Sequence, residues 1–137
     1  MTAKEYLGQA YRLDQRINSK LEQVMSLRDL ATKATSTLSD VAPSGTRNVH
    51  RMEDIIVKIV DLENEINHDI DNLVDLKREM VSVIKAVADP EQQTILELRY
   101  LCFKSWEQIA VDMNYSIQHV YRLRDRAYDE IVPPTER

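Results

Sequence analysis

Glycine and proline are scarce in this chain of 137 residues, which contains two of the first and four of the second. Both residue types interrupt helices. Their scarcity among many leucine, isoleucine, glutamate, lysine and arginine residues predicts an all-α protein. The single cysteine, Cys102, excludes an intramolecular disulfide framework and is typical of a protein from a reducing cytoplasm.

Long apolar runs are missing as well. The first ten residues, MTAKEYLGQA, lack the apolar segment of a signal peptide, and no uninterrupted apolar run reaches the length of a membrane span. We therefore expect a soluble cytoplasmic protein that does not act at a membrane.

An excess of positive charge is also absent, since the formal net charge is −5. This argues against non-specific nucleic-acid binding, which a basic surface usually drives. The distribution of charge is uneven, however, because residues 116–127 hold Arg122, Arg124 and Arg126 against Asp125 alone. Such a local and thin basic footprint predicts weak DNA affinity for one copy, and so a dimer or a protein partner.

The N-terminal third has the periodicity of one long amphipathic helix. Thr2 and Glu5 have the spacing of a capping box at its start. Apolar or small residues then recur in steps of three or four, at Leu7, Ala10, Leu13, Ile17, Leu21, Val24, Leu27, Ala31 and Ala34. Residues 40–48, with Pro43 and Gly45, are predicted to form the loop that follows.

A second and longer helix is predicted after this loop. Its apolar positions advance by a mean of 3.5 residues, the repeat of a left-handed coiled coil, at Met52, Ile55, Ile59, Leu62, Ile66, Ile70, Leu73, Leu76, Met80, Val83 and Val87. A short loop between two such helices predicts an antiparallel hairpin over residues 1–88. Two helices alone bury little, so we expect the hairpin to form a homodimer or to dock on a partner protein. In the alternative, the second helix folds back on the C-terminal residues as one compact monomer.

The remaining residues predict three shorter helices and a frayed tail. Asp89 and Pro90 suit the start of a support helix, where Gln92 would complete a capping box. The helix takes its apolar content from Ile95, Leu96, Leu98, Tyr100, Leu101 and Phe103. We assign residues 89–132 to a helix-turn-helix domain and 133–137 to a flexible tail.

The helix-turn-helix pattern covers residues 106–125. Its inward positions are apolar, namely Trp106, Ile109, Met113, Tyr115, Val120 and Leu123, and Ala110 is small enough for two helices to approach. Asn114 stands at the turn, where a left-handed backbone is needed. Ser105, with Gln108 in a capping box, and Ser116 are suited to cap the two helices. This combination favours DNA binding.

With Val120, Leu123, Ala127 and Ile131 facing inward, the helical period defines the opposite, outward face. Ile117, Gln118, Tyr121 and Arg122 are predicted to face bases in the major groove, with Asp125 beside them. The candidates for phosphate contacts are Ser116, His119, Arg124 and Arg126. A surface helix with three arginines is often only solvated, so the helix-turn-helix spacing is what favours DNA. Trp106 and Tyr115 are predicted to pack in the core.

Residues 90–131 resemble region 4 of bacterial sigma factors. The likeness rests on a support helix, the segment SWEQIAVDMNYS, and a second helix with R-x-R-A before its last turn. The resemblance implies binding of promoter −35 DNA, with Ile117, Gln118, Tyr121 and Arg122 at the base-contacting positions. That family often has charged residues where Ile117 and Tyr121 stand, which leaves the target sequence open.

The whole chain, a helical hairpin followed by a sigma-like end, is similar to small phage and prophage regulators of the ArpU type. The resemblance implies control of phage gene expression, with double-stranded DNA and host RNA polymerase as partners. Two other readings stay open. The chain could be a phage DNA-packaging subunit of the small-terminase kind, or an interaction protein that binds polymerase or a sigma factor without touching DNA.

An enzymatic function is not expected. Glu65 and His68 have a di-iron spacing, but the second such pair is missing. The acidic rows at Asp61, Glu65 and Asp69 and at Asp71, Asp75 and Glu79 are typical of a solvated face or of a surface for a basic partner. The sequence has no glycine-rich phosphate loop, no zinc-ligand spacing and no His near Cys102. We expect neither a cofactor nor a metal.

Overall fold

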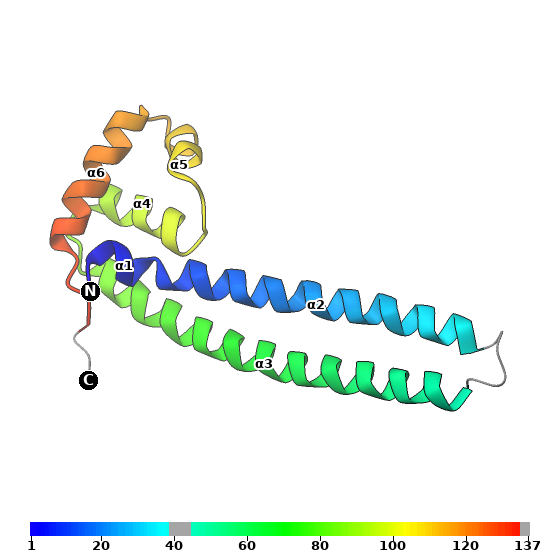
Figure 1. Cartoon of the computed structure of the whole chain (residues 1–137). Helices are drawn as coiled ribbons and strands as arrows, with labels where there is room; N and C mark the ends of the chain where they lie inside the picture. The colour runs from blue at the N-terminus through cyan, green and yellow to red at the C-terminus, as the bar shows by residue number, and fades with distance from the viewer. Residues whose placement is uncertain (39–44, 135–137) are drawn as a thin grey trace. The chain divides into compact units, whose positions relative to one another are not determined.

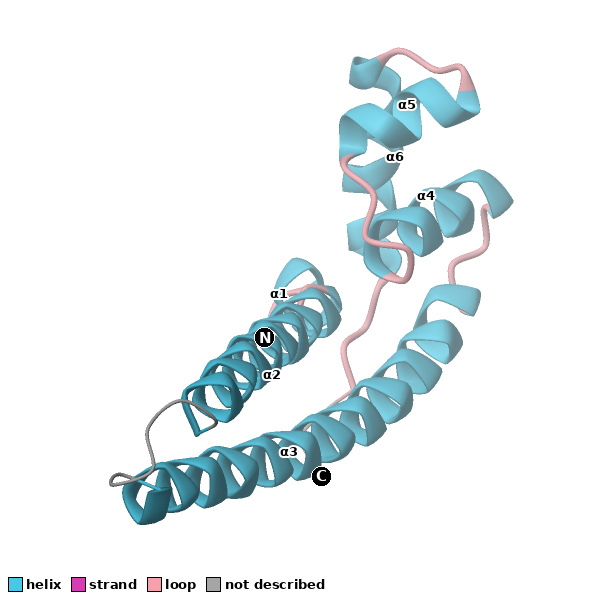
Figure 2. Ribbon diagram, turned by 90° about the vertical axis from the view of Figure 1, so that its right-hand side faces the viewer, coloured by secondary structure: helices cyan, strands magenta, loops and turns pink. Residues whose placement is uncertain are grey.

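The computed structural model describes residues 1–38 and 45–134, and every regular element within these ranges is a helix (Figures 1 and 2). The helices are α1 (Ala3–Leu7), α2 (Gln9–Leu38), α3 (Gly45–Lys85), α4 (Pro90–Tyr100), α5 (Trp106–Met113) and α6 (Ile117–Glu130). The predicted all-α class is confirmed, as is the order of a long hairpin followed by three shorter helices. Most of the predicted loop, residues 40–44 with Pro43, lies outside the described residues, as do residues 135–137 of the tail.

The chain forms two compact units. Residues 14–72, the greater part of α2 and α3, make up the hairpin unit. Residues 1–13 and 73–137 make up the head unit, which contains α1, the adjoining ends of α2 and α3, and α4 to α6. The division therefore falls within both long helices and not at residue 88. It falls there because the first residues and the last turns of α3 pack together with the C-terminal helices.

Within the hairpin unit, α2 and α3 lie side by side and antiparallel (Figure 1). Lys20 Nζ lies 2.6 Å from Asp69 Oδ2, and Arg28 Nη2 lies 2.9 Å from Glu63 Oε1. Residue numbers rise along one helix as they fall along the other. The buried apolar residues between them are Ile17, Val24 and Ile66. The predicted antiparallel hairpin is confirmed here.

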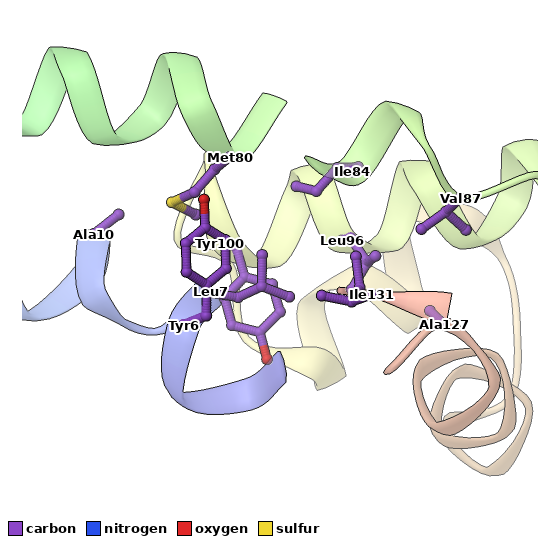
Figure 3. Close-up of a cluster of buried hydrophobic side chains, with 10 residues drawn as sticks. All are labelled: Tyr6, Leu7, Ala10, Met80, Ile84, Val87, Leu96, Tyr100, Ala127 and Ile131. Carbon is purple, nitrogen blue, oxygen red and sulfur yellow. The ribbon is translucent and has the colours of Figure 1, made fainter. Parts of the chain in front are cut away.

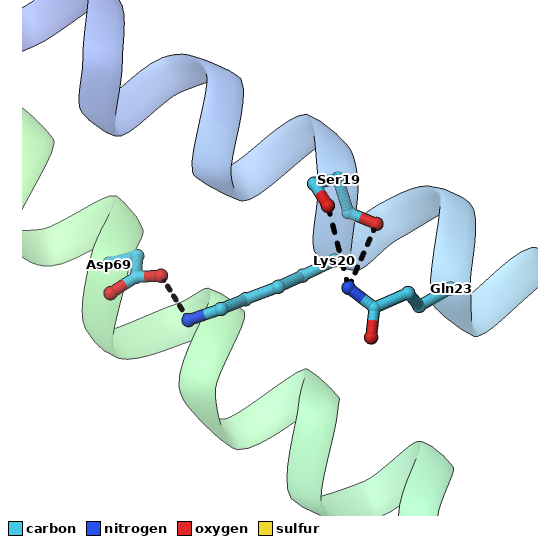
Figure 4. A network of polar contacts seen from close by, with 4 residues as sticks. All are labelled: Ser19, Lys20, Gln23 and Asp69. Atoms are coloured by element: carbon cyan, nitrogen blue, oxygen red, sulfur yellow. Dashed lines mark hydrogen bonds and ion pairs between the residues drawn. The ribbon is translucent and has the colours of Figure 1, made fainter.

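Two inward positions predicted for the hairpin are wrong. Leu21 is 44% exposed and Ile70 is 41% exposed. Asp69 is buried in place of its neighbour, because its carboxylate pairs with the Lys20 ammonium (Figure 4). The two side chains are only 15% and 10% exposed, and the hydrogen bond from Lys20 holds the pKa of Asp69 below its usual value. Gln23, one turn beyond Ser19, donates to that residue's carbonyl and hydroxyl oxygens instead of joining the pair.

The head unit has its own apolar core (Figure 3). Its buried members come from α1, the start of α2, the end of α3, α4 and the end of α6, and they are Tyr6, Leu7, Ala10, Met80, Ile84, Val87, Leu96, Tyr100, Ala127 and Ile131. The Tyr6 hydroxyl donates to Glu79 Oε1 at 2.8 Å, and Lys77 Nζ donates to the Leu101 carbonyl oxygen at 3.1 Å. The alternative in which the second long helix packs on the C-terminal helices therefore holds for its last turns.

Several helix ends differ from the sequence prediction. Thr2 and Glu5 form the predicted capping box, but the helix ends at Leu7, and α2 starts anew after Gly8. The Gly8 N–H donates to the Lys4 carbonyl oxygen at 3.0 Å, and a Cβ at this position would lie 3.1 Å from the same oxygen. The predicted loop is shorter than expected, because α3 begins at Gly45.

The capping box predicted at the start of α4 does not form. Asp89 is the N-cap, and its carboxylate accepts from the Glu91 N–H at 2.9 Å. Gln92 is buried instead of reaching back to the cap, and its Oε1 has no hydrogen-bond partner among the described residues. Gln92 is thus drawn inward with the apolar side of α4, which its polar identity did not indicate.

Candidate nucleic-acid interface

The second apolar core of the head unit belongs to the helix-turn-helix. Ile95 of α4, Ile109 and Ala110 of α5, and Val120 and Leu123 of α6 are all buried together. Met113, Tyr115, Ile117 and Trp106 pack against this cluster while partly exposed. Apart from Ile95 of the support helix and Ile117, which was predicted to face outward, these are the inward positions that the spacing predicts, so the helix-turn-helix arrangement is confirmed. Trp106 also packs against the first core, which places it between the two clusters.

The turn between α5 and α6 has the predicted backbone. Asn114 has φ 57° and ψ 43°, in the left-handed region. The Ser105 hydroxyl accepts from the Gln108 N–H at 3.1 Å, and the Ser116 hydroxyl accepts from the His119 N–H at 3.2 Å. Both predicted N-caps are confirmed. The capping box predicted for Ser105 and Gln108 is incomplete, because the Gln108 side chain donates to Asp112 Oδ1 at 2.7 Å and not back to the cap.

Two of the four predicted base-facing residues have exposed side chains. Gln118 and Arg122 are exposed, and neither side chain has a hydrogen bond or an ion pair with another described residue. Tyr121 is half-buried, with the Arg124 guanidinium carbon 4.6 Å from its ring centre. Ile117 is half-buried against the second core, so it lies at the margin of the outward face.

The four predicted phosphate-contacting residues differ in their interactions with the rest of the protein. Arg126 and the capping residue Ser116 are exposed. The His119 ring lies edge-on to Tyr115, with ring centres 4.7 Å apart. Arg124 Nε donates to Asp125 Oδ1 at 2.9 Å, and this bond raises the pKa of Arg124. The phosphate roles stay predictions, but Arg124 is already engaged within the protein.

The structure adds basic residues that the sequence did not single out. A cleft of about 780 Å³ lies in the head unit between α1, the start of α2, the end of α4 and α6, with Trp106 in its wall. It brings Lys4, Arg12 and Arg99 beside Arg124 of α6. The four residues are spread over more than a hundred positions, so no local pattern could have found this group.

Two other classes of site find no support in the described part of the chain. Residues 1–38 and 45–134 contain no cluster of three His, Cys, Asp or Glu side chains placed to hold a metal ion. The same residues include no helix that is long and apolar enough to cross a membrane.

Comparison with known families decides where the chain belongs. Residues 32–132, well over half of the chain, match the family model described as "Protein of unknown function (DUF1492)". The chain belongs to the DUF1492 family. The match begins near the end of α2 and covers α3 and the complete helix-turn-helix. No curated protein and no solved structure matches the chain.

Proposed function

We propose that this DUF1492 protein is a DNA-binding transcription regulator that places α6 in the major groove. The observation that carries the proposal is the exposure of Gln118 and Arg122 on the second helix of the helix-turn-helix, where neither side chain has a hydrogen bond or an ion pair with another described residue. In helix-turn-helix proteins this helix enters the groove and its outward side chains meet base edges.

The residue types on this face suit base recognition. The Arg122 guanidinium matches the O6 and N7 acceptors of guanine, and the Gln118 amide matches N6 and N7 of adenine. Ile117, which packs partly buried at the margin of the face, would meet a thymine methyl group. Arg126, His119 and Ser116 would contact phosphates on one flank of α6, which fixes the register without adding sequence information.

A homodimer through the hairpin unit is the second part of the proposal. Four of the exposed apolar residues of α3 lie on one stripe, while Val57, which is also exposed, lies off it. The four are Val49, Ile56, Val60 and Ile70, spaced by seven, four and ten residues. At about 100° per residue these fall within roughly 80° of one another. Leu21 and Met25 of α2 are also exposed. Because α2 and α3 pack antiparallel, these two residues lie on the same face of the hairpin as the stripe of α3. A second copy would cover this face.

Dimerisation would also compensate for the weak DNA affinity expected of a single copy. One α6 carries few cations in a chain of net charge −5. Two copies would read two half-sites about one helical turn apart, so that the contacts of both modules add. The resemblance to region 4 of sigma factors and to phage regulators supports a promoter-like site, a cytoplasmic location and RNA polymerase as a further partner.

Selection of bound duplexes from a randomised pool tests this proposal. The wild-type chain should enrich a short motif with two similar halves, because each α6 reads one half-site. Absence of any retained DNA, together with capture of RNA polymerase or a sigma factor in a pull-down, would favour the interaction protein over the regulator.

A further inference from the structure

The cleft beside α6 is rich in cations and in aromatic rings. Lys4, Arg12, Arg99 and Arg124 line it against two carboxylates, those of Glu5 and Asp125. The local balance of charge is therefore positive by two (four cations less two acids), in a chain with a net charge of −5. Such a concentration of one sign in an acidic protein marks a surface for an anionic ligand.

Three of the four cations have no anionic partner among the described residues. Arg12 Nη2 donates only to the Glu5 carbonyl oxygen at 3.3 Å, and Arg99 Nη1 donates to the Lys104 carbonyl oxygen at 3.1 Å. Glu5 Oε2 accepts from the Thr2 N–H at 3.0 Å, and the Glu5 carboxylate forms no ion pair with another described residue. Of the cleft's cations, only Arg124 is paired with a carboxylate of residues 1–38 or 45–134.

Two of the cleft's three arginines, Arg99 and Arg124, are also held against an aromatic ring. The guanidinium carbons of Arg99 and Arg124 lie 5.5 Å and 5.7 Å from the centre of the Trp106 ring. Contact of a guanidinium with an aromatic face limits its rotation and leaves donor groups for a second partner. The bond from Arg99 to the Lys104 carbonyl oxygen fixes that side chain further. Preordered donors bind phosphate at a lower entropic cost than mobile ones.

The cleft adjoins one flank of the proposed recognition face. At about 100° per residue, Arg124 lies roughly 120° from Gln118 on one side of α6, and Arg126 lies roughly 80° from it on the other. Asp125 and Tyr128 of α6 also line the cleft. The major groove is about 12 Å wide, so a phosphate backbone passes each flank of a helix of about that diameter.

We propose that this cleft binds the phosphates of one DNA strand while α6 lies in the major groove, an inference that rests on the proposed function. Arg12 and Arg99 donate to consecutive phosphates on the flank opposite Arg126, and Lys4 adds charge at the edge. The N-terminal segment is thereby part of the DNA-binding surface, although it lies more than a hundred residues before α6 in the sequence.

The test compares Arg12→Ala with Arg78→Ala in the full-length protein. Arg78 is an exposed arginine of α3 that does not line the cleft, so its loss removes the same charge elsewhere. Affinity is measured on the selected duplex and on a random duplex, over a range of salt concentrations. Each phosphate contact contributes about 0.9 to the slope of log K against log salt for duplex DNA.

The expected result is a similar loss of affinity for both duplexes with Arg12→Ala, and a salt slope smaller by about 1. Arg12→Lys should keep the slope, and Arg78→Ala should match the wild type. Arg12 is exposed, and its only side-chain bond within the described part of the chain is to a carbonyl oxygen, so the variant should unfold at the wild-type temperature.

Two outcomes would overturn the inference. If Arg12→Ala binds both duplexes with wild-type affinity and slope while Arg122→Ala loses specificity, the cleft does not hold DNA and the proposed function stands. If the wild type binds no duplex but binds a free mononucleotide or inorganic phosphate through Arg12, both the inference and the proposed function fail.

Discussion

At the residue scale, Asn114 sets the angle at which α6 leaves α5. Its left-handed backbone lets the Tyr115 N–H reach the Ala110 carbonyl oxygen at 2.9 Å, which ends α5 and starts the turn. Asn tolerates this backbone because its short side chain adds little steric conflict. The presentation of Gln118 and Arg122 therefore depends on one residue of the turn, outside α6.

We predict that Asn114→Val lowers the free energy of unfolding by about 1–2 kcal/mol, because a β-branched side chain is strained at positive φ. Asn114→Gly should be near neutral, since glycine adopts this backbone freely. Urea denaturation of the two variants and the wild type measures the difference. Equal stabilities for the valine and glycine variants would show that the turn is not constrained at this position.

The sequence predicts such residues unevenly. Ser105, Asn114 and Ser116 act as predicted because caps and turns depend on contacts within three or four residues. Gln92 and Gln108 do not, since each side chain has a competing environment, a buried position for one and Asp112 for the other. A glutamine has enough reach to leave its cap, and local spacing cannot indicate which partner it takes.

At the element scale, the Lys20–Asp69 pair stabilises the register of α2 against α3. We predict that Asp69→Asn lowers the free energy of unfolding by roughly 1–3 kcal/mol. The substitution removes the charged partner of Lys20, whose side chain is largely buried. Glu63→Gln, at the exposed pair with Arg28, should change it by less than about 1 kcal/mol. Thermal unfolding of both variants is the measurement.

The same pair predicts a dependence on pH. The folded-state pKa of Asp69 is lowered from the unfolded value of about 3.9, so its contribution is present above that value. It is lost as the pH falls through the folded-state pKa. The gap between wild type and Asp69→Asn should therefore be constant near neutral pH and close below about pH 4. A gap that stayed constant in acid would rule out the pair as its cause.

The hairpin helices themselves follow from apolar periodicity, and their pairing follows from the short loop. The inward face is predicted less well, since Leu21 and Ile70 are exposed while Asp69 is buried. A charged residue can be buried between two helices only when a residue of opposite charge lies across from it on the other helix. That depends on the register between helices, which periodicity along one helix does not contain.

At the scale of the whole molecule, the exposed stripe of the hairpin unit predicts a dimer. Introducing Ile56→Glu with Val60→Glu should weaken association by more than about tenfold, since each buried Ile or Val side chain contributes about 1.5–3 kcal/mol. Leu30→Glu, an exposed α2 position outside the stripe, is the matched control and should stay dimeric. Mass measurement in solution over a dilution series gives the result.

A wild-type monomer at all concentrations would contradict the dimer. A ring of eight or more subunits would instead favour the DNA-packaging subunit. Contacts between distant helices are also the feature that the sequence predicts least well. Arg12, Arg99 and Arg124 come together only because the start of α2, α4 and α6 pack on a common core, and no spacing within any one helix places these three residues together.

The most direct test of the account is the affinity for a selected duplex divided by the affinity for its scrambled sequence. Arg122→Ala should lower this ratio by about 5- to 150-fold, which corresponds to about 1–3 kcal/mol for a base contact. Arg126→Ala should lower both affinities alike and leave the ratio unchanged. If both variants reduce the two affinities by the same factor, Arg122 reads no base and the assignment of α6 as the recognition helix is wrong.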